Sequence, residues 1–259
     1  MRPSPSLRWL PCLFVITCGM AAETPSIRVP HAAVRPALTA ATDDPAWAAA
    51  VVIPVLGPSI KERTAAPVLQ ATTVRLLWDA EALYIRFDAL DNDIHLPFTA
   101  HDADLYKGDV AEVFLDVVGD ARAYVELQVS PGNATLDQNI LVTAATPRSD
   151  PEGRLVGEIR DRDLWFDRSY TMEGLRTAAA IRHDGWTVEL AIPAKTALRR
   201  LGAHEWTAGQ HLRANLLRYD WPLKADGTRE LIAMNWAPVI DGCPHLSPQA
   251  MGYLELVAK

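Results

Sequence analysis

Short segments in which apolar and polar residues alternate follow one another from Thr72 to the C-terminus. Each has the length of a β-strand and is bounded by Asp, Asn, Gly or Pro, which favour turns. Such alternation buries one face of a sheet and leaves the other in water. Many short strands with turns between them predict an all-β protein, an antiparallel β-sandwich of the immunoglobulin or jelly-roll type. The segments are TVRLLWD (73–79), ALYIRFDAL (82–90), VAEVFLDVV (110–118), AYVELQVS (123–130), RTAAAIRHDG (176–185), WTVELAI (186–192), HLRANLLRYD (211–220), ELIAMNW (230–236) and YLELVA (253–258).

Two segments depart from this strand pattern. Residues 193–201 (PAKTALRRL) predict one short helix, because a proline lies near the start and two arginines lie near the end, where the helix dipole favours positive charge. Residues 144–172 are polar, charged and poorly periodic, so we expect a long surface loop there. Three tryptophans, Trp47, Trp78 and Trp186, are expected in the core.

The first 22 residues are typical of a secretory signal peptide. Two arginines precede an apolar run over residues 10–20, which is too short to span a bilayer, and small residues follow it. We therefore expect export to the periplasm or the cell exterior. Lipid attachment at Cys18 is disfavoured, because a threonine precedes this cysteine. No other apolar run is long enough to predict a membrane span.

The rest of the chain is predicted to form one domain. Residues 23–45 contain several prolines and alanines with little periodicity, which predicts a flexible lead-in. Residues 46–259 then form the sandwich, and this length suits a single β-rich domain. The sequence contains no linker that would divide it.

The predicted mature chain is acidic and has one cysteine. Residues 1–22 hold two arginines and no acidic residue, so their removal changes the formal charge from −7 to −9. Such a chain is poorly suited to nucleic acid or to an anionic membrane, which positive charge recognises. Two of the three cysteines leave with the leader, so Cys243 remains and is predicted to be a small buried hydrophobe.

The order of several sequence blocks carries a resemblance to a known family. LYKGDVAEVFLD (105–116) follows WDAEALYIRF and precedes AYVELQVSPGN, GWTVELAIPAKTAL and NWAP. In this order the blocks resemble the carbohydrate-binding module family 9-like (CBM9-like) domains, DOMON-related β-sandwiches, over nearly the whole mature chain. The resemblance implies an exported, non-catalytic domain that clamps a sugar unit between aromatic side chains. Polysaccharide or oligosaccharide utilisation beside separate glycoside hydrolases is the implied role.

The resemblance also implies a set of sugar-binding residues. The family pattern aromatic-x-x-Asp-x-x-Glu matches Tyr106, Asp109 and Glu112, so Tyr106 would be one aromatic wall and Glu112 a hydroxyl acceptor. Trp236, which precedes the final strand, would be the second wall, and Asn235 would add a polar contact. An aromatic ring suits the apolar face of a sugar, while planar polar groups orient its hydroxyls.

The strand that follows departs from the family pattern. Glu126 and Gln128 share one face of this strand, because side chains alternate along it. Well-described relatives place an arginine and an asparagine at these positions. The glutamate reverses a charge, so the family's hydroxyl network does not transfer unchanged.

Calcium is a separate expectation implied by the resemblance. Calcium prefers oxygen ligands, and two acidic loops could supply them. The first holds Asp88, Asp91 and Asp93, and the second holds Asp116 and Asp120. The second resembles the D-x-D-G-D turn of relatives, with valine in place of the middle aspartate. The alternative is that both loops are polar turns capped by aspartate side chains.

Enzyme motifs are absent from the sequence. It contains no G-x-S-x-G, no phosphate loop and no H-E-x-x-H, and its histidines lack the spacing of a zinc site. Glycoside hydrolysis would need two carboxylates that flank one bond. Asp109, Glu112 and Glu126 are the candidates for such a pair.

Two alternatives to sugar binding remain open. Similar sandwiches bind haem through an axial methionine with histidine or lysine in exported electron-transfer proteins. An envelope interaction domain that has lost sugar binding is the other. The candidate haem ligands are Met172, Met234, Met251, His183, His211 and His245.

Overall fold

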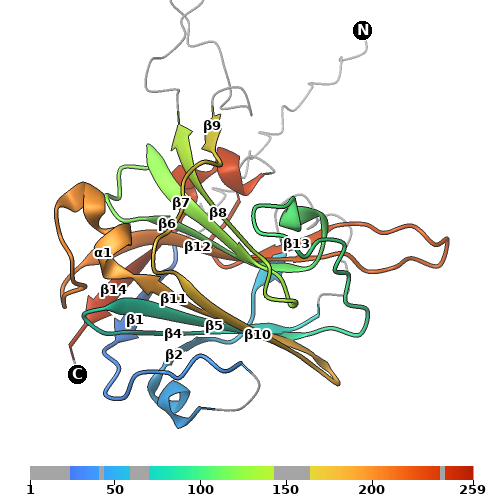
Figure 1. Cartoon of the computed structure of the whole chain (residues 1–259), viewed down its shortest axis with the longest axis horizontal. Coiled ribbons are helices and arrows are strands. Elements are labelled where there is room, and N and C mark those ends of the chain that lie inside the picture. The colour runs from blue at the N-terminus through green and yellow to red at the C-terminus, as the bar shows by residue number, and fades with distance from the viewer. Residues whose placement is uncertain (1–23, 41–43, 59–69, 143–163, 240–242, 259) are drawn as a thin grey trace, which may run out of the picture.

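The computed structural model consists of two β-sheets that stack face to face (Figure 1). It describes residues 24–40, 44–58, 70–142, 164–239 and 243–258. No helix in these ranges is long and apolar enough to cross a membrane. The predicted signal peptide, with Cys18, lies outside the described residues.

The smaller sheet has five strands in the order β10-β11-β5-β4-β2, and all its pairs are antiparallel. Its centre is formed by the two strands with the longest apolar runs, which are buried along nearly their whole length. The strands are β2 (Val51–Ile53), β4 (Thr72–Trp78), β5 (Ala82–Leu90), β10 (Arg176–Arg182) and β11 (Gly185–Pro193).

The larger sheet has nine strands, with the main order β1-β14-β12-β6-β7-β8-β9. β13 pairs with β12 and with β3, and β1 pairs with β14 in parallel, so the sheet is mixed. The strands are β1 (Ser26–Pro30), β3 (Gly57–Pro58), β6 (Val110–Asp116), β7 (Ala123–Val129), β8 (Thr135–Val142), β9 (Leu164–Asp167), β12 (His211–Asp220), β13 (Ile232–Asn235) and β14 (Gly252–Val257).

In the ranges that the structure describes, helical structure is limited to short segments. The α-helix α1 covers Ala194–Ala197. The 3₁₀ segments are η1 (Pro45–Ala49), η3 (Leu105–Lys107), η6 (Arg199–Leu201), η7 (Pro244–Leu246) and η8 (Pro248–Ala250). The predicted helix over 193–201 is therefore divided between α1 and η6.

The main core lies between the two sheets and comes from the apolar residues of the alternating segments. Ile85 and Phe87 of the smaller sheet, with Val113 and Leu127 of the larger one, belong to this core and are fully buried. Burying each such side chain contributes roughly 1.5–3 kcal/mol. The expected core tryptophans Trp47, Trp78 and Trp186 are all buried.

The predicted fold class is confirmed. Among the strands that the sequence pattern did not predict are β1, β8 and β9. β5 and β12 match their predicted ranges to the residue. Within the expected flexible lead-in over 23–45, Ser26–Pro30 forms β1, because this segment pairs with β14 and its Val29 is buried in the main core. Of the expected loop over 144–172, only the last part is described, and it begins with β9.

Candidate functional site

The outward face of three neighbouring strands carries a group of buried polar side chains. Glu112 of β6 pairs across the sheet with Gln128 of β7, and Glu126 of β7 pairs with Gln138 of β8. Alternate residues of these strands, such as Leu127, face the core instead. The alternation that builds the core therefore places all four polar groups together, and each is at most 4 % exposed.

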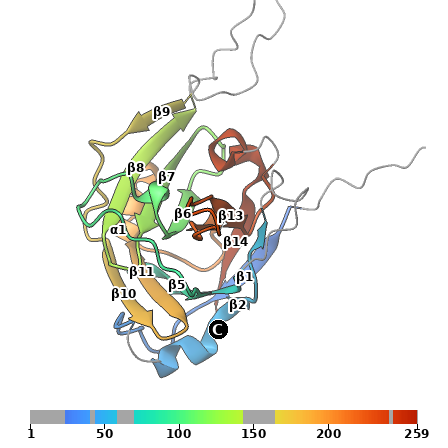
Figure 2. The same cartoon turned by 90° about the vertical axis from the view of Figure 1, so that its right-hand side faces the viewer.

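These four side chains line a cavity of about 490 Å³, which is within the usual size of a small-molecule site. Three aromatic residues, Tyr106, Phe166 and Tyr219, also line it. In both views the red segment that carries η7 lies beside this face (Figure 1, Figure 2). The remaining lining residues are Arg168, Leu231, Cys243 and His245.

Two glutamine amides hold the two carboxylates in place. Gln128 Nε2 donates to Glu112 Oε1 at 2.8 Å and to Glu126 Oε1 at 2.5 Å. Gln138 Nε2 donates to Glu126 Oε2 at 2.7 Å. Three buried oxygens, Glu112 Oε2, Gln128 Oε1 and Gln138 Oε1, accept no hydrogen bond within the described part of the chain. The cavity floor therefore offers acceptors to a ligand that brings donors or positive charge.

The surroundings of Glu112 disfavour its charged form. Burial, and then the charge of Glu126, raise the pKa of Glu112 well above its ordinary range. Burial also raises the pKa of Tyr124, the residue two positions before Glu126 on the same face of β7. The floor of the cavity is thus a place where an uncompensated negative charge is costly.

His245 approaches the carboxylates from η7. Its Nδ1 lies 2.8 Å from the hydroxyl of Tyr124, and its Nε2 lies 3.7 Å from Glu126 Oε2. The imidazole stacks on Phe114 with centroids 4.7 Å apart and meets the edge of Phe166 at 5.1 Å. These contacts fix the ring with Nε2 toward the carboxylates.

Tyr106 is held at the edge of the cavity by a turn. It is the middle residue of η3, and its carbonyl accepts a hydrogen bond from Trp221 Nε1 at 3.0 Å. Lys107 lies 5.6 Å from the ring centroid and pairs with Asp104 at 2.8 Å. The indole of Trp221 therefore holds the backbone at Tyr106, and the side chain of Lys107 lies against the tyrosine ring.

Asp109 lies outside this cavity, although the family pattern includes it. It is 1 % exposed and accepts hydrogen bonds from the backbone amides of His95 and Trp221. One oxygen of each of Asp91, Asp109 and Asp220 lies within 4.8 Å of the others. Burial is the main cause that raises the pKa of Asp109 to about 7. Its role in the structure is to hold two loops together.

We expect Asp109 to make stability fall as pH rises toward neutrality. Its pKa rises from an ordinary 3.8 to about 7 in the folded chain. The folded chain therefore keeps a proton that the unfolded chain has lost, and the free energy of unfolding falls by about 1 kcal/mol per pH unit in this window. Asp109→Asn removes this titration. We expect the melting temperature of the wild type to fall by about 2–4 °C more per pH unit than that of the variant between about pH 5 and pH 7. Equal slopes of melting temperature against pH would contradict the assignment.

Trp236 and Asn235 also lie outside the cavity. The indole of Trp236 packs against the main core, and a Cβ added to Gly252 would lie 2.7 Å from its ring atoms. Asn235 is buried, and its Nδ2 donates to the carbonyl of Ala237 at 2.5 Å. Of the seven predicted sugar-binding residues, the structure brings Tyr106 together with the Glu112, Glu126 and Gln128 group and leaves the other three apart from it.

Carboxylates of the first acidic loop form ion pairs with arginines. Asp88 pairs with Arg75, Arg86 and Arg182, and Asp93 forms a two-oxygen pair with Arg229 at 3.0 Å. Positive charge around these carboxylates opposes a cation. The donors present at Asp88 and Asp93 therefore do not fit calcium.

The remaining predicted calcium ligands are also engaged. Asp91 Oδ2 accepts from Trp186 Nε1 at 3.0 Å and from Arg218 at 3.1 Å. Asp116 accepts three backbone amides of its own turn, and Asp120 accepts the amide of Arg122. The second loop has the geometry of a turn capped by aspartate side chains.

Several residues that line the cavity are not among the seven sugar-binding residues predicted from the sequence. Gln138 lies in β8, where three consecutive polar residues (137–139) weaken the strand pattern. A sequence signal for Gln138 exists, because it alternates with Leu136 and Ile140 on one face of the strand. All three side chains face outward and are buried. Phe166, Arg168, Tyr219, Leu231 and His245 come from segments far apart in the sequence, so no local pattern joins them.

Cys243 differs from its predicted environment. It is half-buried, and it lines the cavity rather than the apolar core. The segment 243–250 crosses the outward face of the larger sheet, so this cysteine meets polar side chains there.

The methionines considered as haem ligands are all buried among core residues. Met172 and Met234 belong to the main core, and Met251 packs with Phe114 and Tyr124. His183 and His211 are exposed. None of the methionines is among the described residues that line the cavity.

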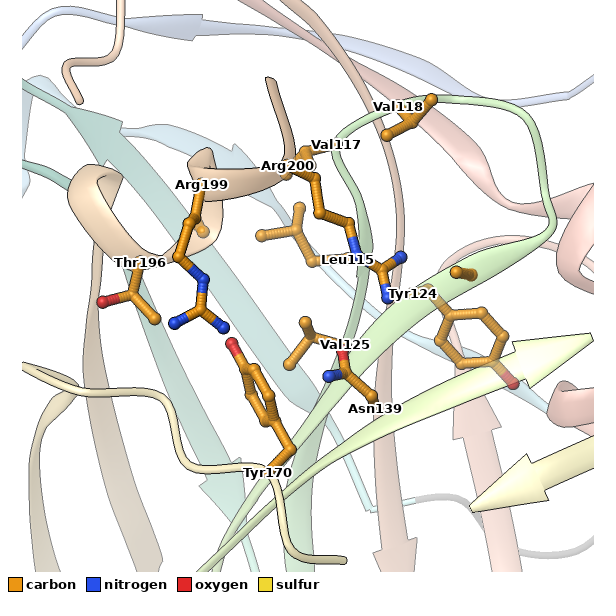
Figure 3. Close-up of a pocket in the computed structure, with 12 residues that line it drawn as sticks. Leu115, Val117, Val118, Tyr124, Val125, Asn139, Tyr170, Thr196, Arg199 and Arg200 are labelled. Carbon is orange, nitrogen blue, oxygen red and sulfur yellow. The ribbon is translucent and has the colours of Figure 1, made fainter. Parts of the chain in front are cut away.

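A second hollow lies between the β6–β7 turn and the α1–η6 segment (Figure 3). Tyr170, Asn139, Arg199 and Arg200 line it, but its volume is about 40 Å³. This is room for a few water molecules and is far below the usual size of a sugar-sized site. The larger cavity is therefore the candidate site.

Comparison with known proteins identifies the family. The model described as "Carbohydrate family 9 binding domain-like" matches residues 40–259. The chain belongs to this family. The family assignment made from the order of sequence blocks is confirmed. No curated protein matches the chain significantly.

Solved structures share the fold of this family 9-like domain. A family 9 carbohydrate-binding module from Caldicellulosiruptor kristjanssonii in complex with cellotriose has a TM-score of 0.59 at 17% identity, covering 90% of this chain and 94% of that one. The module from the same organism in complex with glucose has a TM-score of 0.58 at 17% identity, covering 90% and 96%. A putative carbohydrate-binding protein from Bacteroides uniformis has a TM-score of 0.63 at 10% identity, covering 90% and 100%.

Proposed function

We propose that this family 9-like domain binds a sugar unit in the cavity over β6, β7 and β8. The observation that carries the proposal is the set of unpartnered acceptor oxygens on the cavity floor, Glu112 Oε2, Gln128 Oε1 and Gln138 Oε1, beside aromatic rings. Sugar hydroxyls bring the donors that these oxygens lack. Family membership supports the same ligand class.

The proposed site differs from a clamp between Tyr106 and Trp236. Tyr106 keeps its place as one aromatic wall, and Phe166 and Tyr219 are the other rings that line the cavity. Glu112, Glu126, Gln128 and Gln138 are the proposed hydroxyl partners. Trp236 supports the sheet from the core side and has no proposed contact with the sugar.

The arrangement of the carboxylates supports binding rather than hydrolysis. Hydrolysis requires two carboxyl groups on either side of the bond that breaks. Here Gln128 Nε2 lies between Glu112 and Glu126 and donates to both. Both carboxyl groups lie on the same floor of the cavity and share one amide donor, rather than facing each other across it, so we propose a non-catalytic role.

We further propose that the protein works outside the cytoplasm, beside separate glycoside hydrolases. The N-terminal sequence supports export, because two arginines, a short apolar run and small residues follow one another there. Capture of an oligosaccharide by this domain would keep the substrate near such enzymes.

Replacing Tyr106 by alanine is expected to weaken sugar binding about 10-fold. Loss of one aromatic wall removes about 1–1.5 kcal/mol of stacking. Isothermal titration with cello-, xylo- and manno-oligosaccharides, chosen after a glycan array, measures the change. Tyr253→Ala is the matched control, because Tyr253 is an exposed tyrosine on β14 that does not line the cavity.

Three outcomes would contradict the proposed site or its ligand. Binding of no glycan on the array would favour an envelope interaction domain that keeps the fold without the ligand. Equal affinities of Tyr106→Ala and the wild type would place the sugar elsewhere on the domain. A purified protein with a haem absorption band would favour the electron-transfer alternative.

A further inference from the structure

Three side chains with metal-binding atoms converge on the cavity floor. Glu112 comes from β6, Glu126 from β7 and His245 from η7. One ligand atom from each lies within 4.8 Å of the other two. An ion bound at about 2.0–2.2 Å from each atom holds its ligands at most about 4.4 Å apart, so small side-chain adjustments bring the three atoms onto one ion. The fold thus joins residues that are far apart in the sequence into one potential coordination sphere.

Nearby side chains supply little positive charge to the two carboxyl groups. Within the described residues, the ion pairs give Glu126 only His245 as a partner, at 3.7 Å, and give Glu112 none. Arg168 lines the cavity but is paired with Asp104 at 3.0 Å. A buried carboxylate without a cation or a proton is strongly destabilising.

An unpartnered ligand atom provides a second, independent observation. Glu112 is 1 % exposed, and its Oε2 accepts no hydrogen bond within the described ranges. Its other oxygen is held by Gln128. The free oxygen therefore belongs to a fixed carboxylate that lines the cavity and lacks a partner there.

Outer contacts orient all three groups as they do around metal ligands. The histidine of a metal site commonly has its second nitrogen hydrogen-bonded, and ligating carboxylates are themselves hydrogen-bonded. His245 Nδ1 is bonded to the hydroxyl of Tyr124, and the two glutamine amides hold Glu112 and Glu126. The stack on Phe114 fixes the plane of the imidazole.

We propose that Glu112, Glu126 and His245 bind a divalent transition-metal ion at the floor of the cavity. Imidazole with carboxylates suits zinc and similar ions, whereas calcium and magnesium prefer oxygen alone. Cys243 lines the same cavity, two residues before His245, and can add a thiolate. The remaining coordination positions face the cavity, where they can take water or a ligand oxygen. The inference does not depend on sugar binding.

Zinc titration of the chelator-treated full chain tests the proposal. We expect one zinc ion per chain by calorimetry and by elemental analysis after dialysis. Glu112→Gln and His245→Gln should each weaken zinc binding by about 100-fold or more, because loss of a direct ligand exceeds the 10–100-fold effect of an outer contact. His183→Gln, whose side chain is 93% exposed, is the matched control and should bind as the wild type does.

A spectroscopic measurement keeps the test independent of how the variants fold. Cobalt(II) added to the wild type should give the visible bands of an ion with nitrogen and oxygen ligands, and zinc should displace it. The proposal is overturned if the wild type binds no zinc, or if Glu112→Gln and His245→Gln bind zinc as tightly as the wild type does. Binding of calcium in preference to zinc also overturns it. Because these measurements are made without any glycan, they test the metal site separately from the proposed sugar site.

Discussion

Replacing Arg218 by methionine is expected to lower the free energy of unfolding by about 3–5 kcal/mol at neutral pH. Arg218 is 0% exposed and pairs with Asp91 at 3.1 Å and with Asp220 at 3.5 Å. It also donates to the carbonyl of Leu90 at 2.8 Å and to the hydroxyl of Thr72 at 3.0 Å. Methionine fills much of the volume but leaves the buried acidic groups without their cation.

The pH dependence of this loss provides a sharper test. Burial is the main cause that raises the pKa of Asp220 to about 6 and that of Asp109 to about 7. At about pH 5 both groups hold a proton, so the cost of losing Arg218 should be smaller than at about pH 8. Urea unfolding at the two pH values measures the difference.

Arg28→Met is the matched control for Arg218→Met. The side chain of Arg28 is 73% exposed, and its nearest acidic partner, Glu255, lies 3.5 Å away. A change within about 0.5 kcal/mol is expected for this surface pair. A loss of similar size in the two variants would contradict the role assigned to Arg218.

The second large effect is expected for Gly185→Ala, with a loss of about 3 kcal/mol and a melting temperature about 6–12 °C lower. Gly185 begins β11 with a φ of 151°, and an added Cβ would lie 2.0 Å from the carbonyl oxygen of Ala89 and 2.8 Å from the amide of Asp91. Both neighbours are backbone atoms, so neither can move without displacing β5. Thermal unfolding followed by circular dichroism measures the change.

Gly209→Ala separates this clash from a general cost of removing glycine. Gly209 also has a positive φ, of 87°, but no atom lies within 4 Å of its added Cβ. We expect a loss of about 1–2 kcal/mol, which reflects the backbone conformation alone. If both variants lost the same stability, the close approach of Ala89 would not be the cause.

Gly185 also links the fold to the acidic cluster. The amide of Asp91 donates to the carbonyl of Asp184, the residue before this glycine. Displacement of the β10–β11 turn would therefore move Asp91, and with it the partner of Arg218. Because the sites share this contact, the effects of Gly185→Ala and Arg218→Met should not add in a double variant.

The strands of the sandwich could be predicted from sequence where alternation was strong. β5 and β12 have unbroken apolar spacing, and their ends coincide with turn residues. β8 was missed, because three consecutive polar residues obscure its pattern, and β1 was assigned to a flexible lead-in, because its proline-rich surroundings carry little periodicity. Both strands depend on partners that lie elsewhere in the chain.

For the candidate site, the sequence alone determined the positions that share a face of one strand. Glu126 and Gln128 lie together because side chains alternate, and the spacing from Tyr106 to Glu112 follows from a turn that leads into β6. Only the tertiary structure decided what meets that face. It brought His245 and Gln138 to the carboxylates and directed Trp236 onto Gly252, because strand order and loop crossings are set by packing of the whole chain rather than by local spacing.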